Sequence, residues 1–287
     1  MNSDSKIAPG ISRRLRFSVR SLLIVTTIAA IGIGLYRHRI VFAQQIQAVK
    51  LVEGHGGQVF YEPRKFSIYD SLLGGSGDVV VGIDMRSRTL DTETVKAIGS
   101  LNNLRFLDLS YTNVKDLGPL SNLNSLQELM LWRVPAKDFS PIGKLARLKR
   151  LELTETPISD LRPLQDLKEL ECLNLWKSPI EDLTPLSGLS KLKTIYLNFT
   201  PVDDISPLKG LAAMEELHLS NTAVHEIGHL SKMKQLRILG LHNTGVKDLG
   251  PIFELSNLQY LRLGGCDIAQ EQIDHLMKVL PNCELQK

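Results

Sequence analysis

The hydrophobic residues of this chain recur with a fixed period of 22 residues from residue 104 onward. The first apolar residue of each repeat defines position one, and its eight members are Leu104, Leu126, Leu148, Leu170, Leu192, Met214, Leu236 and Leu258. Position four is Leu or Ile, position six is always Leu, and both alternate with residues of mixed polarity. This alternation predicts a short strand with one buried face. The fixed period predicts a repeat solenoid whose neighbouring units share one continuous core.

The second half of each repeat carries turn signals. Position nine is mostly small or hydroxyl-bearing, and its members are Thr112, Val134, Thr156, Ser178, Thr200, Thr222, Thr244 and Cys266. Such side chains can pack inside a tight turn and hydrogen-bond neighbouring backbone. Positions thirteen to seventeen read Asp-Leu-x-Pro-Leu, as in 116–120 and 182–186. Asp is a good cap and Pro is tolerated in a first helical turn, so we predict a single 3-10 turn on the outer side.

These repeats resemble the short, 22-residue class of leucine-rich repeats found in internalins and in phosphatase regulators. The resemblance covers residues 95–287, about two thirds of the chain. It implies an α/β repeat solenoid, curved as a horseshoe, with a parallel β-sheet on the concave face and 3-10 turns on the convex face. Those families usually carry Asn at position nine, whereas this chain carries mostly Thr, so a hydroxyl ladder replaces an amide ladder. A closer likeness is to bacterial membrane-anchored repeat proteins with an Arg-rich N-terminus and Thr at position nine.

Both ends of the stack need a cap, because an open hydrophobic stack would face water. At the N-terminal side, Val80, Ile83 and Met85 predict a preceding strand displaced by two residues. At the C-terminal side, apolar residues at helical spacing predict a capping helix that ends before Pro281; they are Ile268, Ile273, Leu276, Met277 and Leu280. A ninth, partial strand is then expected, in which Leu280, Cys283 and Leu285 take positions one, four and six.

The N-terminal segment contains an uncharged apolar run over 21–36. Basic residues flank it on both sides, namely Arg13, Arg14, Arg16 and Arg20 before it and Arg37, His38 and Arg39 after it. At ~1.5 Å per residue the run spans roughly 24 Å, short of the ~30 Å hydrocarbon core, but snorkelling arginines and local thinning would allow a span. We predict an uncleaved anchor in the inner membrane, with the N-terminus in the cytoplasm and the repeats outside. The alternatives are a buried core helix or a signal peptide cleaved near 41–43, which would release a secreted form.

The expected segments are therefore a cytoplasmic basic tail over 1–20, a transmembrane anchor over 21–36, a linker and N-terminal cap region over 37–79, a capping repeat over 80–103, leucine-rich repeats over 104–265 and a C-terminal cap over 266–287.

Composition and motifs argue against catalysis and against nucleic acid as a partner. The formal net charge is only +3, and much of the excess is the N-terminal arginine cluster. No phosphate loop is present, and no nucleophile is paired with a base. His218 and His242 could lie near each other but lack a third metal ligand, and Cys172 falls at an outward strand position. We therefore expect no enzyme activity, no cofactor and no metal site.

Aromatic residues are placed unevenly within the repeats. Seven of the nine between residues 104 and 265 occupy positions three, five, seven or eight, which face outward. Both tryptophans stand at position seven and precede a cation, as Trp132-Arg133 and Trp176-Lys177. Exposed aromatics beside cations are typical of binding hot spots. The predicted binding residues on the concave face are Phe106, Glu128, Trp132, Arg150, Glu152, Trp176, Tyr196, Phe199 and Tyr260; the alternative is that these aromatics merely pack on each other.

The functional hypothesis is a membrane-anchored binding module that recognises a protein, or alternatively a glycan, through its concave face. A competing hypothesis is a cytoplasmic scaffold or a regulator of an enzyme such as a phosphatase, which requires the opposite topology.

Overall fold

The computed structural model describes residues 19–63 and 78–287, and the chain divides into two compact units. The first unit comprises residues 1–42 and 66–76, and its described part is the N-terminal portion of the helix α1 (Val19–Gly54). The second unit comprises residues 43–65 and 77–287 and contains all the repeats. Residues 1–18 of the expected basic tail and residues 64–77 of the expected linker lie outside the described residues.

The transmembrane anchor expected over 21–36 falls within α1, and the side chains at several of its positions are not among those described. Within the described ranges, no helix combines the length and the apolar character that crossing a bilayer requires.

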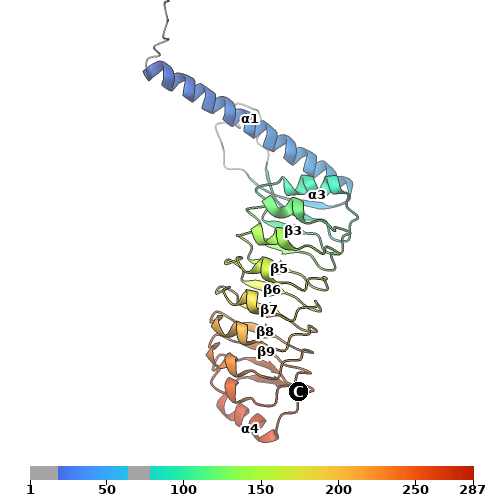
Figure 1. The fold of residues 1–287 in the computed structure, drawn as a ribbon, viewed down its shortest axis with the longest axis vertical. Coiled ribbons are helices and arrows are strands. Elements are labelled where there is room, and N and C mark those ends of the chain that lie inside the picture. Colours follow the sequence, from blue (N-terminus) through green and yellow to red (C-terminus); the bar gives the residue numbers. More distant parts are fainter. Residues whose placement is uncertain (1–18, 64–77) are drawn as a thin grey trace, which may run out of the picture. The chain divides into compact units, whose positions relative to one another are not determined.

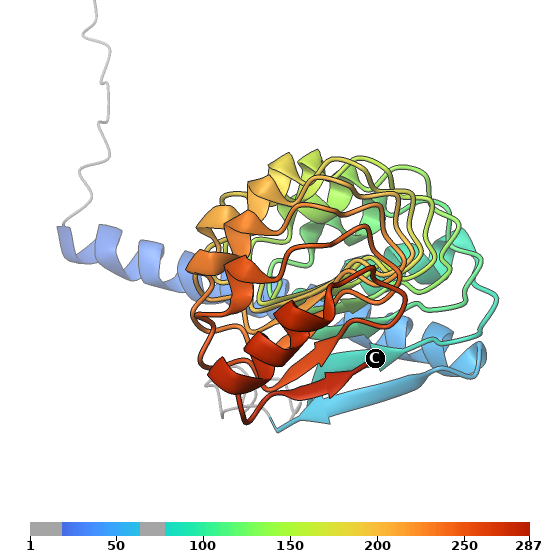
Figure 2. The same ribbon diagram turned by 90° about the horizontal axis from the view of Figure 1, so that it is seen from below.

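The second unit is built on a single sheet of 11 strands, arranged in sequence order. Its strands are β1 (Gln58–Glu62), β2 (Val79–Asp84), β3 (Phe106–Asp108), β4 (Glu128–Met130), β5 (Arg150–Glu152), β6 (Cys172–Asn174), β7 (Thr194–Tyr196), β8 (Glu216–His218), β9 (Ile238–Gly240), β10 (Tyr260–Arg262) and β11 (Glu284–Gln286). The edge strand β1 is antiparallel to β2, and all later pairs are parallel. Successive coils follow one another along the stack (Figure 1) and, viewed end on, overlie each other with strands and 3-10 turns on opposite sides (Figure 2).

The strand register keeps each repeat position in line with the same position of the next repeat. Leu107, Leu129 and Leu151 at position four are direct partners on neighbouring strands, and each is 0% exposed. The leucines of position six, such as Leu153 and Leu197, are equally buried. The repeat period therefore produces one continuous aliphatic core, as predicted. The opposite, solvent-facing side of the strands, together with positions seven and eight, is called the sheet face below.

The chain leaves each strand through a left-handed residue at position eight. Seven non-glycine residues there have φ values from 52° to 60°, namely Tyr111, Arg133, Glu155, Lys177, Phe199, Asn221 and Asn243. Glycine fills this position only in the last repeat, at Gly265. The hydroxyl at position nine then closes the turn: Thr200 Oγ1 donates to the Leu197 carbonyl at 2.6 Å. The expected hydroxyl ladder is present, but most of its hydrogen bonds close the turn of their own repeat.

The outer side of each repeat is a 3-10 turn, as expected. The turns are η1 (Gly118–Asn122), η2 (Ser140–Lys144), η3 (Arg162–Leu164), η4 (Thr184–Leu186), η5 (Ser206–Gly210), η6 (Gly228–Lys232) and η7 (Gly250–Ile252). Asp116 Oδ1 accepts a hydrogen bond from the Gly118 amide at 2.8 Å, although the capping residue itself is Leu117. The aspartate thus acts one residue earlier than a standard cap, through an Asx turn.

Each end of the stack uses a true α-helix where the inner repeats use a 3-10 turn. The helix α3 (Thr92–Gly99) lies between β2 and β3, and α4 (Gln270–Val279) lies between β10 and β11. Ile83 pairs with Leu107, and Leu261 pairs with Leu285. At each end of the stack, the chain therefore uses two residues more between paired positions of neighbouring strands than it does in the inner repeats. Leu285 therefore occupies position four, and its expected assignment to position six is wrong. An α-helix rises less per residue than a 3-10 helix, so it needs extra residues to span one coil.

The N-terminal cap contains elements that the sequence pattern did not predict. Ala48 and Val52, in the part of α1 that belongs to this unit, are 0% exposed and join the core. The strand β1 then pairs with β2. Residues 43–54 and 58–62 are thus structured within the interval expected to be a linker and cap region of undefined structure.

Candidate binding site

The predicted residues occupy positions three, five, seven and eight of their repeats, all on the sheet face. Phe106, Glu128 and Arg150 are direct neighbours at position three of β3 to β5, with Tyr260 further along the same row on β10. Glu152 and Tyr196 stand at position five, two strands apart. The remaining three, Trp132, Trp176 and Phe199, follow their strands at positions seven and eight. The structure therefore places Phe106, Glu128 and Arg150 side by side and leaves Tyr260 apart from them.

Glu152 is the predicted residue whose environment differs most from the expectation. Its side chain is only 8% exposed. Its carboxylate accepts a hydrogen bond from Arg150 Nη1 at 3.1 Å and another from Trp132 Nε1 at 3.4 Å. Glu152 is therefore not an exposed contact residue: it orients an arginine and a tryptophan that are more accessible than itself.

The two tryptophans each meet an aromatic residue of a neighbouring repeat. Trp132 lies edge-on to Tyr111, with ring centroids 6.4 Å apart. Trp176 lies edge-on to Phe199, with centroids 5.6 Å apart. Edge-to-face contacts of this kind hold aromatic side chains in fixed orientations. Two rigid aromatic pairs therefore stand along the same margin of the sheet face.

A row of charged residues connects the two aromatic pairs. Glu155 accepts a hydrogen bond from Arg133 Nε at 2.5 Å and lies 3.7 Å from Lys177 Nζ. The Arg133 guanidinium is 5.7 Å from the centre of the Tyr111 ring, and the Lys177 ammonium is 5.1 Å from that of Trp176. The order along position eight is therefore aromatic, cation, anion, cation, aromatic. We call this set the aromatic edge; its members are Tyr111, Trp132, Arg133, Glu155, Trp176, Lys177 and Phe199.

The electrostatics of the aromatic edge follow from these contacts. The hydrogen bond from Arg133 is the main reason that the pKa of Glu155 lies below its usual value, with Lys177 adding to the effect. The same hydrogen bond raises the pKa of Arg133. Sequence reasoning noted both cations but missed Glu155. The available signal was the alternation of charge sign at position eight in successive repeats.

One hollow of about 190 Å³ opens beside the Tyr111–Trp132 pair. Its walls are Phe106, Met130 and the two aromatic rings. On its floor Asp108, with a side chain 2% exposed, accepts hydrogen bonds from Arg86 Nε at 3.0 Å and Nη2 at 2.6 Å. The floor charge is therefore already neutralised, and the hollow suits an apolar side chain of a ligand.

Tyr196 belongs to a separate cluster on the sheet face. Its ring stacks on His218 with centroids 4.4 Å apart, and its hydroxyl lies 3.5 Å from Glu216 Oε2. Burial lowers the pKa of His218, although the nearby Glu216 carboxylate opposes this. In the parts of the chain that the structure describes, no three His, Cys, Asp or Glu residues are grouped in a way that could hold a metal ion.

Cys172 is buried, contrary to its expected outward exposure. It pairs in register with Arg150 on one side and Thr194 on the other, and only 9% of it is exposed. Burial raises the pKa of its thiol to about 11, so the thiol stays protonated at neutral pH. The position faces the sheet surface, but the longer neighbouring side chains cover so small a residue.

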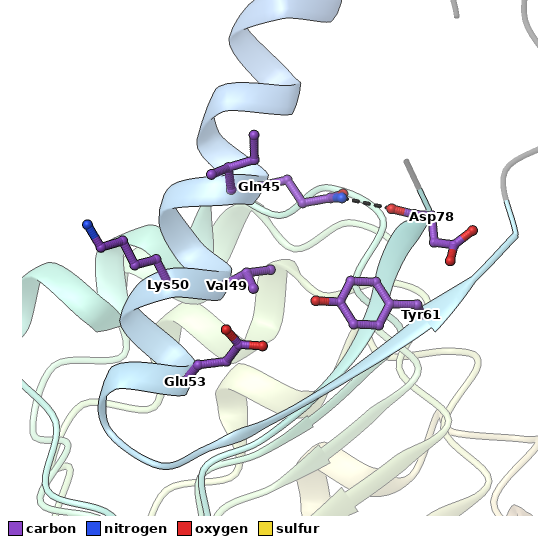
Figure 3. A pocket seen from close by; sticks show the side chains of 7 residues that line it. Gln45, Val49, Lys50, Glu53, Tyr61 and Asp78 are labelled. Carbon is purple, nitrogen blue, oxygen red and sulfur yellow. Dashed lines mark hydrogen bonds between the residues drawn. The ribbon is translucent and has the colours of Figure 1, made fainter. Parts of the chain in front are cut away.

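A further hollow, of about 470 Å³, lies near the N-terminal cap (Figure 3). It is bounded by the α1 residues Gln45, Val49 and Glu53 and by Tyr61 of β1. Gln45 Nε2 donates to the Asp78 carbonyl at 2.8 Å, which joins α1 to the start of β2. None of the predicted binding residues lines this hollow, so it is distinct from the aromatic edge.

Comparisons with known proteins agree with this geometry. The family model "Leucine Rich repeats (2 copies)" matches residues 168–210. The structure is similar to that of internalin C2 of Listeria monocytogenes, with 30% identity and a TM-score of 0.61 over 66% of this chain and 85% of that one. It is also similar to another Listeria monocytogenes internalin, InlF, with 25% identity and a TM-score of 0.56 over 67% of this chain and 63% of that one.

A leucine-rich repeat protein of Leptospira interrogans shares the fold, with 22% identity and a TM-score of 0.50 over 67% of this chain and 62% of that one. This chain therefore spans somewhat less than two thirds of two of these three proteins. No curated protein matches the chain. The parallel sheet, the 3-10 turns and these likenesses define a leucine-rich repeat solenoid, a class whose members are typically protein-binding. The chain belongs to the leucine-rich repeat proteins.

Proposed function

We propose that this protein binds another protein through its sheet face and that the aromatic edge is the anchor of the interface. The observation that carries the proposal is the arrangement of the two pairs, Tyr111–Trp132 and Trp176–Phe199, on either side of the Arg133–Glu155–Lys177 ion pairs. Aromatic residues and arginines on a rigid support supply most of the energy in protein interfaces.

Exposure supports the same residues. Phe199 is 49% exposed, Tyr111 is 44% exposed and Trp132 is 37% exposed, although each sits on a well-packed repeat. Large aromatic side chains left in water in a contiguous group mark interaction sites more often than structural ones. Because the repeats hold the backbone still, little conformational entropy is lost when a partner covers them.

The hollow beside Tyr111 and Trp132 gives the proposed interface a specific pocket. Its apolar walls and neutralised Asp108–Arg86 floor would accept one apolar side chain of the partner. Glu152 would hold the Trp132 indole in place through the Nε1 hydrogen bond. A glycan is the alternative ligand.

The test is affinity capture on the immobilised full chain, with quantitative mass spectrometry of what it retains. We expect Trp132→Ala and Trp176→Ala each to reduce capture of the specific partner at least tenfold, since truncated interface anchors cost about 2 kcal/mol or more. Lys209→Ala, on the outer turn η5, is the matched surface control and should change nothing. Retention of the partner by both tryptophan variants, with loss in the Lys209 variant, would place the site on the outer turns.

We also propose that the repeats act outside the cytoplasm. The support is the excess of arginines before the uncharged run over 21–36. Protease added to intact spheroplasts should then degrade the repeats. Protection of the repeats until lysis would instead support the cytoplasmic scaffold or enzyme regulator.

A further inference from the structure

A second hollow of the sheet face, of about 410 Å³, lies toward the C-terminal end of the stack. One side is formed by Trp176 and Phe199, the last aromatic pair of the aromatic edge. The opposite side is formed by His242 and Arg262, and Asn198 and Ser220 lie between them. We call it the C-terminal hollow.

The charge of the C-terminal hollow is not balanced from within. Arg262, His242 and Lys287 line it, and none of its lining residues carries a carboxylate side chain. Within the described chain, the Arg262 guanidinium makes no ion pair. Arg86, in the hollow beside Tyr111 and Trp132, is the opposite case, because its guanidinium is bound to Asp108 at 2.6 Å. The two hollows therefore have similar aromatic walls. A carboxylate neutralises the arginine in the first hollow, whereas no carboxylate side chain lines the second.

The acidic residues nearest to the C-terminal hollow do not supply the missing charge. Glu216 lies 3.6 Å from His218 Nε2 and 3.5 Å from the Tyr196 hydroxyl, so its carboxylate is engaged in that cluster. Glu284 lines the adjacent hollow, which Arg262 also borders, and it does not line this one. An arginine held without a carboxylate beside a hydrophobic wall favours an incoming anion, since guanidinium–carboxylate hydrogen bonds are strong and directional.

The aromatic wall indicates what carries the anion. Trp176 and Phe199 meet at an interplanar angle of 73°, and the Lys177 ammonium lies over the Trp176 ring. The pair therefore forms a corner and leaves no broad flat platform on which a sugar ring would stack. A corner of this shape suits a branched or aromatic side chain.

We infer that the C-terminal hollow binds an acidic segment of a protein partner, with a carboxylate on Arg262 and His242 and a neighbouring apolar side chain in the Trp176–Phe199 corner. This inference rests on the proposed function and names the chemistry of the partner. It divides the sheet face into an apolar pocket at Trp132 and an anion-binding subsite at Arg262.

The experiment uses the full chain labelled with fluorotryptophan, because its two tryptophans give two fluorine NMR signals, one for each end of the aromatic edge. Trp132→Phe and Trp176→Phe assign the signals. The probes are the peptide acetyl-Asp-Glu-Phe-Glu-Asp-amide, its neutral counterpart acetyl-Asn-Gln-Phe-Gln-Asn-amide, and polygalacturonate oligomers as an anionic glycan. We expect the acidic peptide to shift the Trp176 signal saturably and to bind about tenfold more tightly than the neutral one, with added salt weakening it.

Arg262→Gln should reduce the affinity of the acidic peptide about tenfold. Arg147→Gln removes the same charge from an exposed position away from the hollow and should leave the affinity unchanged. Equal binding of the two peptides, or an unchanged affinity in the Arg262 variant, would overturn the inference. A Trp176 shift with polygalacturonate and none with the peptide would overturn it in favour of a glycan.

Failure of this inference is distinguishable from failure of the proposed function. If a protein captured by the full chain is lost on Trp132→Ala but retained on Arg262→Gln, the sheet face binds proteins and the acidic-segment assignment is wrong. If neither tryptophan variant affects capture, the proposed function itself fails.

Discussion

Arg133 and Glu155, at position eight of neighbouring repeats, form an ion pair between the two aromatic pairs of the sheet face. Because hydrogen bonding to Arg133 is the largest cause of the lowered pKa of Glu155, Arg133→Gln should raise that pKa toward its usual value. Lys177→Gln should raise it less, since the Lys177 contact is longer. Carboxyl-detected NMR titration of the three proteins measures this order directly.

The sign of the accompanying stability effect is fixed. A carboxyl whose pKa is depressed in the folded state stabilises the fold above its unfolded pKa, and that contribution is lost as pH falls through the folded value. Glu155 should therefore contribute above a pH of about 4.5 and lose its contribution in more acidic solution, an effect that Arg133→Gln should reduce and leave only to Lys177. Equal acid sensitivity of both proteins would show that the ion pair has no energetic role.

The buried leucines of position six should dominate stability. Leu153 and Leu197 are 0% exposed and surrounded by the core, so Leu153→Ala and Leu197→Ala should each cost about 2–5 kcal/mol of unfolding free energy. Since neighbouring repeats share each interface, hydrogen exchange should rise in the repeats on both sides of the mutation. Urea denaturation gives the free energy, and a loss under ~1 kcal/mol at both sites would contradict the assigned inward face.

The repeats themselves could be predicted from sequence because their signal is carried by the side chains that make the core. Leu at position six and Leu or Ile at position four fix the strand, its face and its register at once. Six of the seven 3-10 turns follow from the Asp and Pro that precede the turn's buried residue, whereas η6 has Glu226 and His229 at those two positions. These features depend only on local pattern and period.

The C-terminal end and the charge network could not be predicted in the same way. The two-residue displacement of the strand at Ile83 was predicted and is confirmed, but Leu285 was assigned to position six and lies at position four, because no periodic signal marks the extra residues that α4 needs. Glu152 is buried because Trp132 and Arg150 cover it, which depends on three neighbouring side chains together. The prediction that Glu152 and Cys172 are exposed was therefore wrong. Their burial depends on side chains of neighbouring repeats, which the alternation of residues along one strand does not show.

Cys172 should react slowly with alkylating reagents in the folded protein. Burial raises the pKa of its thiol to about 11, and only the thiolate is nucleophilic. Iodoacetamide at pH 8 should therefore modify Cys172 far more slowly in the native protein than in urea, as measured by peptide mass spectrometry. The same shift stabilises the fold below the unfolded pKa of 9.0, and this contribution should fade as pH rises toward 11. Rapid native labelling would mean that the side chains over Cys172 open readily.

Position eight allows the backbone to be tested separately from the side chains. Lys177 has a φ of 59°, a region in which L-residues are strained by roughly 1–2 kcal/mol and glycine is not. Lys177→Gly and Lys177→Ala both remove the ammonium from Glu155 and from the Trp176 ring, so the difference between them reports only on the backbone. We expect the glycine variant to be more stable than the alanine variant by about 1 kcal/mol.

At Lys209, in the 3-10 turn η5, the order should reverse because glycine there only adds unfolded-state entropy. Urea denaturation of the four variants decides the matter: if alanine is the more stable at both positions, the left-handed turn after each strand is not an obligatory feature of the repeat.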